Sequence, residues 1–162
     1  MKKILSILAL TGCIVLLGGC NKDDDAGPSK TFNFKVDGDD FKTKDIYAVR
    51  TGHKLMIIAY DTELTKVDPT DPDEFKKVNS LQMLINLDNM DEDTYDIEDL
   101  SLTELNILYS KNGESYIATK GKIKFTTLTK DKVEATFECV VTNGSDEIEI
   151  ENGKLNTSVV AG

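Results

Sequence analysis

The sequence predicts an all-β fold, either an antiparallel β-sandwich or a lipocalin-like barrel of roughly 8–10 short strands, in a single domain. Apolar and polar residues alternate along most of the chain after residue 31. Turn-forming residues separate these segments at intervals of roughly 8–12 residues. Past the first 30 residues, no window of about ten residues carries an apolar stripe with the 3.6-residue period of a helix. The segment 73–80 has room for one helical turn only.

Hairpin signals occur along the first half of the predicted domain. In each, two alternating segments lie on either side of a short turn that contains Gly, Asp or Asn. The segments are 32–36 before the turn 37–40, then 46–49 and 55–60 around the turn 51–53, and finally a half-buried strand at 80–88.

The second half of the chain repeats this pattern. Alternating apolar positions predict strands with one face in the core, and Asn-Gly pairs are strong signals for tight turns. The predicted strands cover 95–97, 105–109, 116–127, 133–141 and 148–150, and the turns lie at 111–114, 129–132, 143–146 and 152–153.

A short leader precedes the domain. Lys2 and Lys3 are followed by an apolar segment from Ile4 to Leu17, and then by Gly18, Gly19 and Cys20. This apolar segment is shorter than the roughly 20 residues that a membrane-spanning helix needs. The stretch 17–20 resembles the lipobox of bacterial lipoproteins, so we expect residues 1–19 to be a signal peptide. The resemblance implies that Cys20 becomes the acylated first residue, which carries diacylglyceryl and palmitate-type chains.

Acidic residues follow directly after this cysteine. The stretch Asn21-Lys22-Asp23-Asp24-Asp25 resembles the export signal of surface-displayed lipoproteins in the Bacteroidota, with Lys22, Asp23, Asp24 and Asp25 as its charged residues. The resemblance implies an outer-membrane protein that is lipid-anchored and exposed at the cell surface. The alternative is a protein that faces the periplasm, with these acids in a generic solvated spacer. In both cases residues 20–30 form a flexible lipidated tether.

The charge balance excludes one class of partner. The whole chain has 19 basic and 29 acidic residues, and removal of Lys2 and Lys3 with the leader leaves 17 against 29, a net charge of −12. A phosphate backbone repels such a chain, so we expect no nucleic-acid partner. The residues after the tether, 31–162, suit a single domain with its own core.

Few residues point to catalysis. After Cys20, the remaining cysteine is Cys139, which falls on the apolar face of the strand at 133–141, so we interpret it as a buried thiol. His53 is the chain's single histidine and lies in a predicted turn. The sequence contains neither the Gly-x-Ser-x-Gly elbow of hydrolases nor a glycine loop that could bind phosphate. We therefore expect no enzymatic activity and no catalytic residues.

Carboxylates offer one possible cofactor site. Asp88, Asp91 and Asp93 lie within one acidic loop, and calcium prefers such oxygen ligands. The loop does not follow the EF-hand order, because Asp93 stands where that motif needs glycine. A second acidic cluster covers 68–74. Calcium is thus a possible ligand, and solvated turns are the alternative interpretation; apart from the lipid on Cys20, we expect no cofactor.

The domain resembles a broad group of small Bacteroidota lipoproteins of unassigned function. The resemblance implies a sandwich or lipocalin-like barrel, and supplies no catalytic residues. We expect a non-catalytic binding or accessory module for a protein or glycan partner; the alternatives are a carrier of a small apolar ligand and a calcium-stabilised structural module. Strand packing accounts for most of the five tyrosines. The segments that carry the resemblance are 32–38, 94–97, 121–125, 136–137, Ile148 and 153–155, and the tyrosines are Tyr47, Tyr60, Tyr95, Tyr109 and Tyr116.

Overall fold

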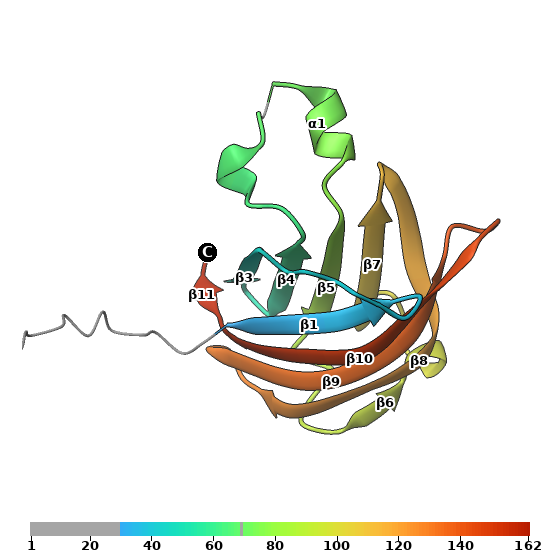
Figure 1. Cartoon of the computed structure of the whole chain (residues 1–162). Helices are drawn as coiled ribbons and strands as arrows, with labels where there is room; N and C mark the ends of the chain where they lie inside the picture. Colours follow the sequence, from blue (N-terminus) through green and yellow to red (C-terminus); the bar gives the residue numbers. More distant parts are fainter. Residues whose placement is uncertain (1–29, 69) are drawn as a thin grey trace, which may run out of the picture.

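The computed structural model describes residues 30–68 and 70–162, and these form one strongly curled β-sheet (Figure 1). The prediction of an all-β fold is confirmed. The strands are β1 (Thr31–Val36), β2 (Asp39–Asp40), β3 (Asp45–Thr51), β4 (Lys54–Tyr60), β5 (Ser80–Asn86), β6 (Thr94–Asp96), β7 (Leu105–Lys111), β8 (Glu114–Leu128), β9 (Lys132–Thr142), β10 (Glu147–Ser158) and β11 (Val160–Ala161); the short helices are η1 (Leu64–Lys66), α1 (Pro72–Lys76) and η2 (Ile97–Asp99).

The sheet order is β11-β3-β4-β5-β7-β8-β9-β10-β1-β2. Outside this order, β6 pairs with residues 122–124 of β8. Neighbouring strands are antiparallel, except that β11 pairs with β3 in parallel. Figure 1 shows β4, β5 and β7 rising behind β1, β10 and β9, which run across the view. The sheet is therefore a half-barrel. Of the two expected architectures, the barrel-like one describes it better, because the described residues contain a single sheet.

Glycines and bulges account for the curl. The register shifts in β8 between Ala118 and Lys120, and in β10 between Ile150 and Gly153. Each bulge adds a residue on one strand, which increases the local twist and bends the strand. Gly121 has a φ of +133°, and a side chain there would meet the backbone of β9. With these bends, the strands β8, β9 and β10 follow the curved sheet without interruption for 15, 11 and 12 residues.

One predicted turn is wrong for this reason. The pair Asn152-Gly153 was expected to end a strand, but β10 continues through it as a bulge. Asn152 has the positive φ of 53° that such a bulge needs. The local sequence gives the same signal for a turn and for this kind of bulge, and only the pairing with β9 distinguishes them.

The concave face of the half-barrel is filled by apolar side chains, which form one continuous core. Aromatic rings occupy its centre: Phe32 packs edge-on against Phe34 and Phe137, with ring centroids 5.6 Å and 5.8 Å apart. Twelve of the largest side chains are less than 2% exposed: Phe32, Phe125, Leu55, Ile57, Leu81, Met83, Ile85, Ile107, Ile123, Ile150, Val133 and Val141.

The outer surface differs between the two halves of the sheet. Outside β3, β4 and β5 it carries apolar side chains among polar ones, with Tyr47, Met56 and Leu84 between 36% and 44% exposed. Outside β8, β9 and β10 it is mainly polar, with Lys, Glu and Thr side chains the most frequent. In residues 30–68 and 70–162, no helix has the length and apolar character needed to cross a bilayer.

Candidate functional site

The predicted lipidation and export residues, Cys20, Lys22, Asp23, Asp24 and Asp25, lie outside the described residues. Their roles stay predictions.

The three aspartates of the acidic loop are used separately. Asp88 Oδ1 lies 2.7 Å from His53 Nδ1, at the end of the β3–β4 hairpin. Asp91 Oδ1 accepts a hydrogen bond of 2.6 Å from the Tyr95 hydroxyl, and Asp93 Oδ1 accepts one of 2.7 Å from a backbone N–H. The described part of the chain contains no group of three or more Asp, Glu, His or Cys residues that could hold a metal ion. The three carboxylates of this possible calcium site are not brought together, because the loop directs each one to a different local donor.

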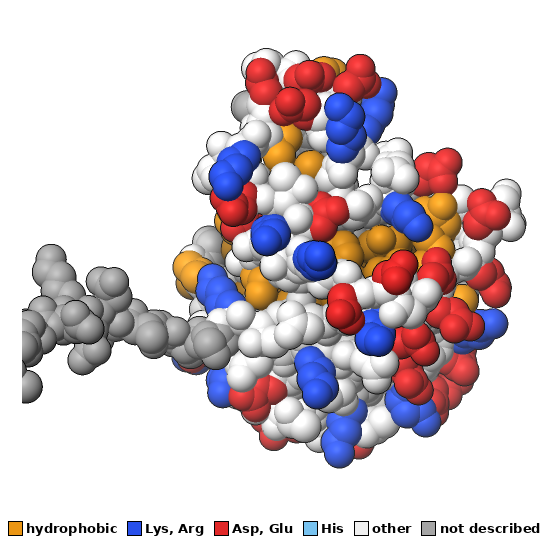
Figure 2. Space-filling view, in the orientation of Figure 1, with side chains coloured by type: hydrophobic (Ala, Val, Ile, Leu, Met, Phe, Trp, Pro, Cys, Tyr) orange, Lys and Arg blue, Asp and Glu red, His pale blue; other side chains and the backbone are white. Residues whose placement is uncertain are grey.

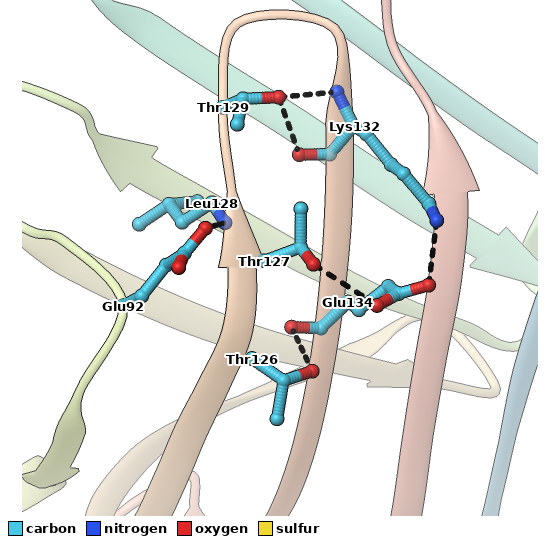
Figure 3. Close-up of polar contacts among 7 residues, drawn as sticks. All are labelled: Glu92, Thr126, Thr127, Leu128, Thr129, Lys132 and Glu134. Carbon is cyan, nitrogen blue, oxygen red and sulfur yellow. Dashed lines mark hydrogen bonds and ion pairs between the residues drawn. The ribbon is translucent and has the colours of Figure 1, made fainter.

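The loop is instead attached to the β8–β9 hairpin (Figure 3). Glu92 Oε1 accepts a hydrogen bond of 3.3 Å from the Leu128 N–H. On the neighbouring strand, Glu134 accepts a hydrogen bond of 3.0 Å from Thr127 and lies 2.7 Å from Lys132 Nζ. These two contacts, first that of Lys132, lower the pKa of the Glu134 carboxyl. Glu92 therefore links the loop to the hairpin, and Glu134 links the two strands within the hairpin.

Cys139 supplies the one thiol and His53 the one imidazole of the described residues. Cys139 is 4% exposed in β9, as the alternation predicted, and burial raises the pKa of its thiol to about 12. A thiol with this pKa is uncharged and unreactive at neutral pH. The His53 side chain, as expected, is exposed in the turn after β3. The core position of Cys139 and the surface position of His53 place them in different environments.

A hollow at one end of the half-barrel has the features of a binding site. We call it the mouth pocket. It has a volume of about 420 Å³. Figure 2 shows hydrophobic side chains in a hollow on this side of the molecule, with acidic and basic side chains around them. The pocket is lined by Val36, Asp39, Asp40, Phe41, Lys42, Lys44, Asp61, Asn79, Tyr109 and Lys111.

Aromatic rings form the floor of the mouth pocket. The Phe41 ring stacks on Phe34 at a centroid distance of 4.3 Å and meets Tyr109 edge-on at 6.3 Å. The Phe41 N–H donates to the Phe34 carbonyl at 2.9 Å, which fixes the chain as it leaves β2. Tyr109 is 3% exposed, and its pKa is raised to about 12, first by burial and then by the negative charges of Asp61 and Asp37. The floor thus consists of packed aromatic rings, and its phenol stays protonated at neutral pH.

A carboxylate–amide pair forms one wall. Asp61 Oδ2 accepts a hydrogen bond of 2.6 Å from Asn79 Nδ2, and Asp61 Oδ1 accepts bonds of 3.0 Å from the Asn79 N–H and the Thr62 hydroxyl. The Asn79 side-chain oxygen accepts from the Asn112 N–H at 3.1 Å. These contacts join the ends of β4, β5 and β7. The polar groups are therefore held in place before any ligand arrives, which lowers the entropic cost of binding.

This combination suits a ligand with both apolar and hydroxyl-bearing surface. Aromatic rings bind the apolar C–H face of such a ligand, and fixed carboxylate and amide groups hydrogen-bond its hydroxyls. The sequence did not indicate this site. Tyr109 was assigned to strand packing, and Asp61 and Asn79 are 18 residues apart on two sides of α1. The position of Phe41 directly after a turn, outside any long strand, is the one local signal that it differs from a core residue.

No known protein family matches the chain, and comparisons with curated proteins and with solved structures find no similar protein.

Proposed function

We propose that this protein is a lipid-anchored surface lipoprotein whose all-β domain is a non-catalytic binding module, and that the mouth pocket takes a glycan partner. One observation carries the choice of ligand. The Phe41–Tyr109 floor and the Asp61–Asn79 wall converge on one opening of about 420 Å³. Mouths of β-barrels are common ligand sites.

The alternative of an apolar-ligand carrier has less support. A carrier needs an apolar void inside the barrel, whereas the inward-facing side chains of this sheet pack against one another as a continuous core. The opening that does exist at the mouth is ringed by charged side chains such as Asp40, Lys42 and Lys111.

Calorimetric titration with neutral and acidic oligosaccharides tests the ligand assignment. We expect Asn79→Ala to weaken binding at least tenfold, because it removes a preorganised hydrogen-bonding group. Phe41→Ala should have the same effect, and its thermal midpoint must be compared with that of the native protein, since Phe41 also packs against the core. Tyr47→Ala is the matched control, because Tyr47 is 44% exposed and lies on the outer face of β3.

Two results would contradict the assignment. Equal affinity of the native, Asn79→Ala and Phe41→Ala proteins for the oligosaccharide would show that the glycan does not bind in the mouth pocket. Tight binding of an apolar fluorescent fatty acid, with no oligosaccharide bound, would favour the carrier.

The surface location has its own test. We expect replacement of Lys22, Asp23, Asp24 and Asp25 by alanine to leave acylation intact and to retain the protein on the periplasmic side. Protease treatment and antibody labelling of intact cells, at matched expression, measure this. If both forms are equally exposed, the acidic stretch is only a spacer; if both are inaccessible, the native protein faces the periplasm.

A further inference from the structure

The outer face of β6, β8, β9 and β10 contains a second depression, which we call the lysine groove. Its volume is about 400 Å³. It lies on the convex side of the sheet, whereas the mouth pocket lies at the end of the concave side. Its lining combines three lysines and other polar residues with one carboxylate and one aromatic residue, and consists of Thr94, Lys122, Lys124, Thr136, Phe137, Glu138, Asn152, Gly153 and Lys154.

The strand register aligns the polar groups of this groove. Thr94 in β6 is opposite Lys124 in β8, and Lys124 is opposite Thr136 in β9. Thr136 is in turn opposite Lys154 in β10. Neighbouring strands lie about 4.8 Å apart, so the two lysines stand about 10 Å apart at their backbones, with a hydroxyl between them. Lysine side chains are long enough to meet over that hydroxyl.

The two lysines of this row differ from their neighbours in charge pairing. Lys122 Nζ lies 3.0 Å from Asp96 Oδ1, and this contact raises the pKa of the Lys122 ammonium. Lys122 is also opposite Glu138 in the register. By contrast, Lys124 and Lys154 form no ion pair with the residues that the structure describes.

The groove lining contains three lysines and one glutamate, whereas the whole chain has 29 acidic and 19 basic residues. Lys124 and Lys154, placed on either side of the Thr136 hydroxyl, together with Lys122 outnumber the Glu138 carboxylate of the lining, which leaves a local excess of positive charge on an acidic molecule. Such a site attracts an anionic group from solution.

The bulge of β10 completes the groove. Asn152 has a φ of 53° at this bulge and lines the groove beside Lys154. Gly153 contributes only backbone there, because the space that a side chain would occupy is taken by the Phe137 ring. The groove floor is thus set by the core, and its polar groups come from strands and not from loops.

We propose that the lysine groove binds the sulfate or carboxylate groups of an acidic polysaccharide. Lys124 and Lys154 supply the positive charge, and Thr136, Thr94 and Asn152 supply neutral hydrogen-bonding groups for the adjoining sugar. A nucleic acid fits less well, because phosphate backbones are bound by longer basic stripes, with aromatic rings for exposed bases. No residue lines both the lysine groove and the mouth pocket.

The test compares two charge-matched double variants by calorimetry. One is Lys124→Gln with Lys154→Gln, and the other is Lys66→Gln with Lys76→Gln, which removes the same charge from lysines that are paired with Glu63 and Asp73. The probes are a sulfated oligosaccharide, an oligogalacturonate, a neutral dextran, inorganic sulfate and single-stranded DNA.

We expect the groove variant to bind the sulfated oligosaccharide or the oligogalacturonate at least tenfold more weakly than the native protein, and the control variant to lose less than twofold. The oligosaccharide that binds more tightly identifies the anionic group, sulfate or carboxylate, that the groove recognises. An equal loss in both variants would overturn the proposal, as would equal binding of single-stranded DNA, of neutral dextran, or of inorganic sulfate alone. Phe41→Ala should leave this binding unchanged, so that failure at the mouth pocket and failure at the groove are distinguishable.

Discussion

Gly153 allows a direct test of how the half-barrel is packed. A β-carbon at this position would lie 2.4 Å from Phe137 Cε1 and 2.5 Å from Cδ1 and Cζ, well inside van der Waals contact. Its backbone is not in the left-handed region, so alanine is compatible with the local conformation and the clash with the ring is the whole cost. Overpacking of a core costs about 1–3 kcal/mol, and we expect Gly153→Ala to destabilise the protein by this amount.

Trimming the ring should relieve the clash. Phe137→Leu removes Cε1 and Cζ, two of the three ring atoms that the new methyl group would meet, so the double variant should be more stable than the sum of the single variants predicts, by about 1–2 kcal/mol. Gly121→Ala is the control: there the β-carbon would lie 2.3 Å from the Glu138 backbone oxygen, and φ is +133°. No change of the Phe137 side chain relieves that contact, so this second pair should be additive within about 0.5 kcal/mol.

Urea unfolding followed by far-ultraviolet circular dichroism measures the native protein and the five variants, since the chain has no tryptophan for fluorescence. Two results would refute the reasoning: a cost of Gly153→Ala below about 0.5 kcal/mol, or additivity of Gly153→Ala with Phe137→Leu.

Three further expectations concern the core and the anchor. Leu81→Ala should cost about 2–5 kcal/mol, because Leu81 is fully buried, whereas Leu84→Ala should cost about 1 kcal/mol or less, because Leu84 is 37% exposed; urea midpoints compare them. Burial raises the pKa of the Cys139 thiol from 9.0 to about 12. The contribution of the uncharged thiol to the free energy of unfolding is therefore complete below pH 9 and is lost as the pH rises to 12. Cys139→Ala should therefore lose less stability across this range, and equal pH profiles would contradict this. Cys20→Ser should abolish incorporation of radiolabelled fatty acid, and retained label would exclude the lipoprotein assignment.

Local turn chemistry explains which parts of the fold could be predicted. The turns at 37–40, 111–114 and 143–146 are where the sequence places them, because glycine or asparagine with positive φ is needed within a few residues. The alternation of 133–141 likewise placed Cys139 correctly in the core. These features depend on residues that are close together in the chain.

The curl and the sites depend on residues that are far apart. The bulge at Gly153 is determined by Phe137 on the neighbouring strand, and no local pattern distinguishes it from a turn. The mouth pocket joins Phe41 to Tyr109, which are 68 positions apart, because the half-barrel brings the chain that leaves β2 over the end of β7. The acidic loop shows the opposite case: Asp88, Asp91 and Asp93 are close in sequence, yet the loop directs them to separate donors.

The two proposed sites share one structural support, although they lie on different faces. Gly153 forms part of the floor of the lysine groove, and the Phe137 ring lies directly over it on the core side. That ring packs near Phe34 at a centroid distance of 6.3 Å, and Phe34 stacks on Phe41 in the floor of the mouth pocket. Packed rings resist compression, so a methyl group added at Gly153 must displace the rings of Phe137, Phe34 and Phe41 or move strand β10. The bulge that shapes the outer groove therefore also positions the aromatic floor at the mouth, and NMR shifts of the Phe41 ring in Gly153→Ala would measure how far the displacement extends.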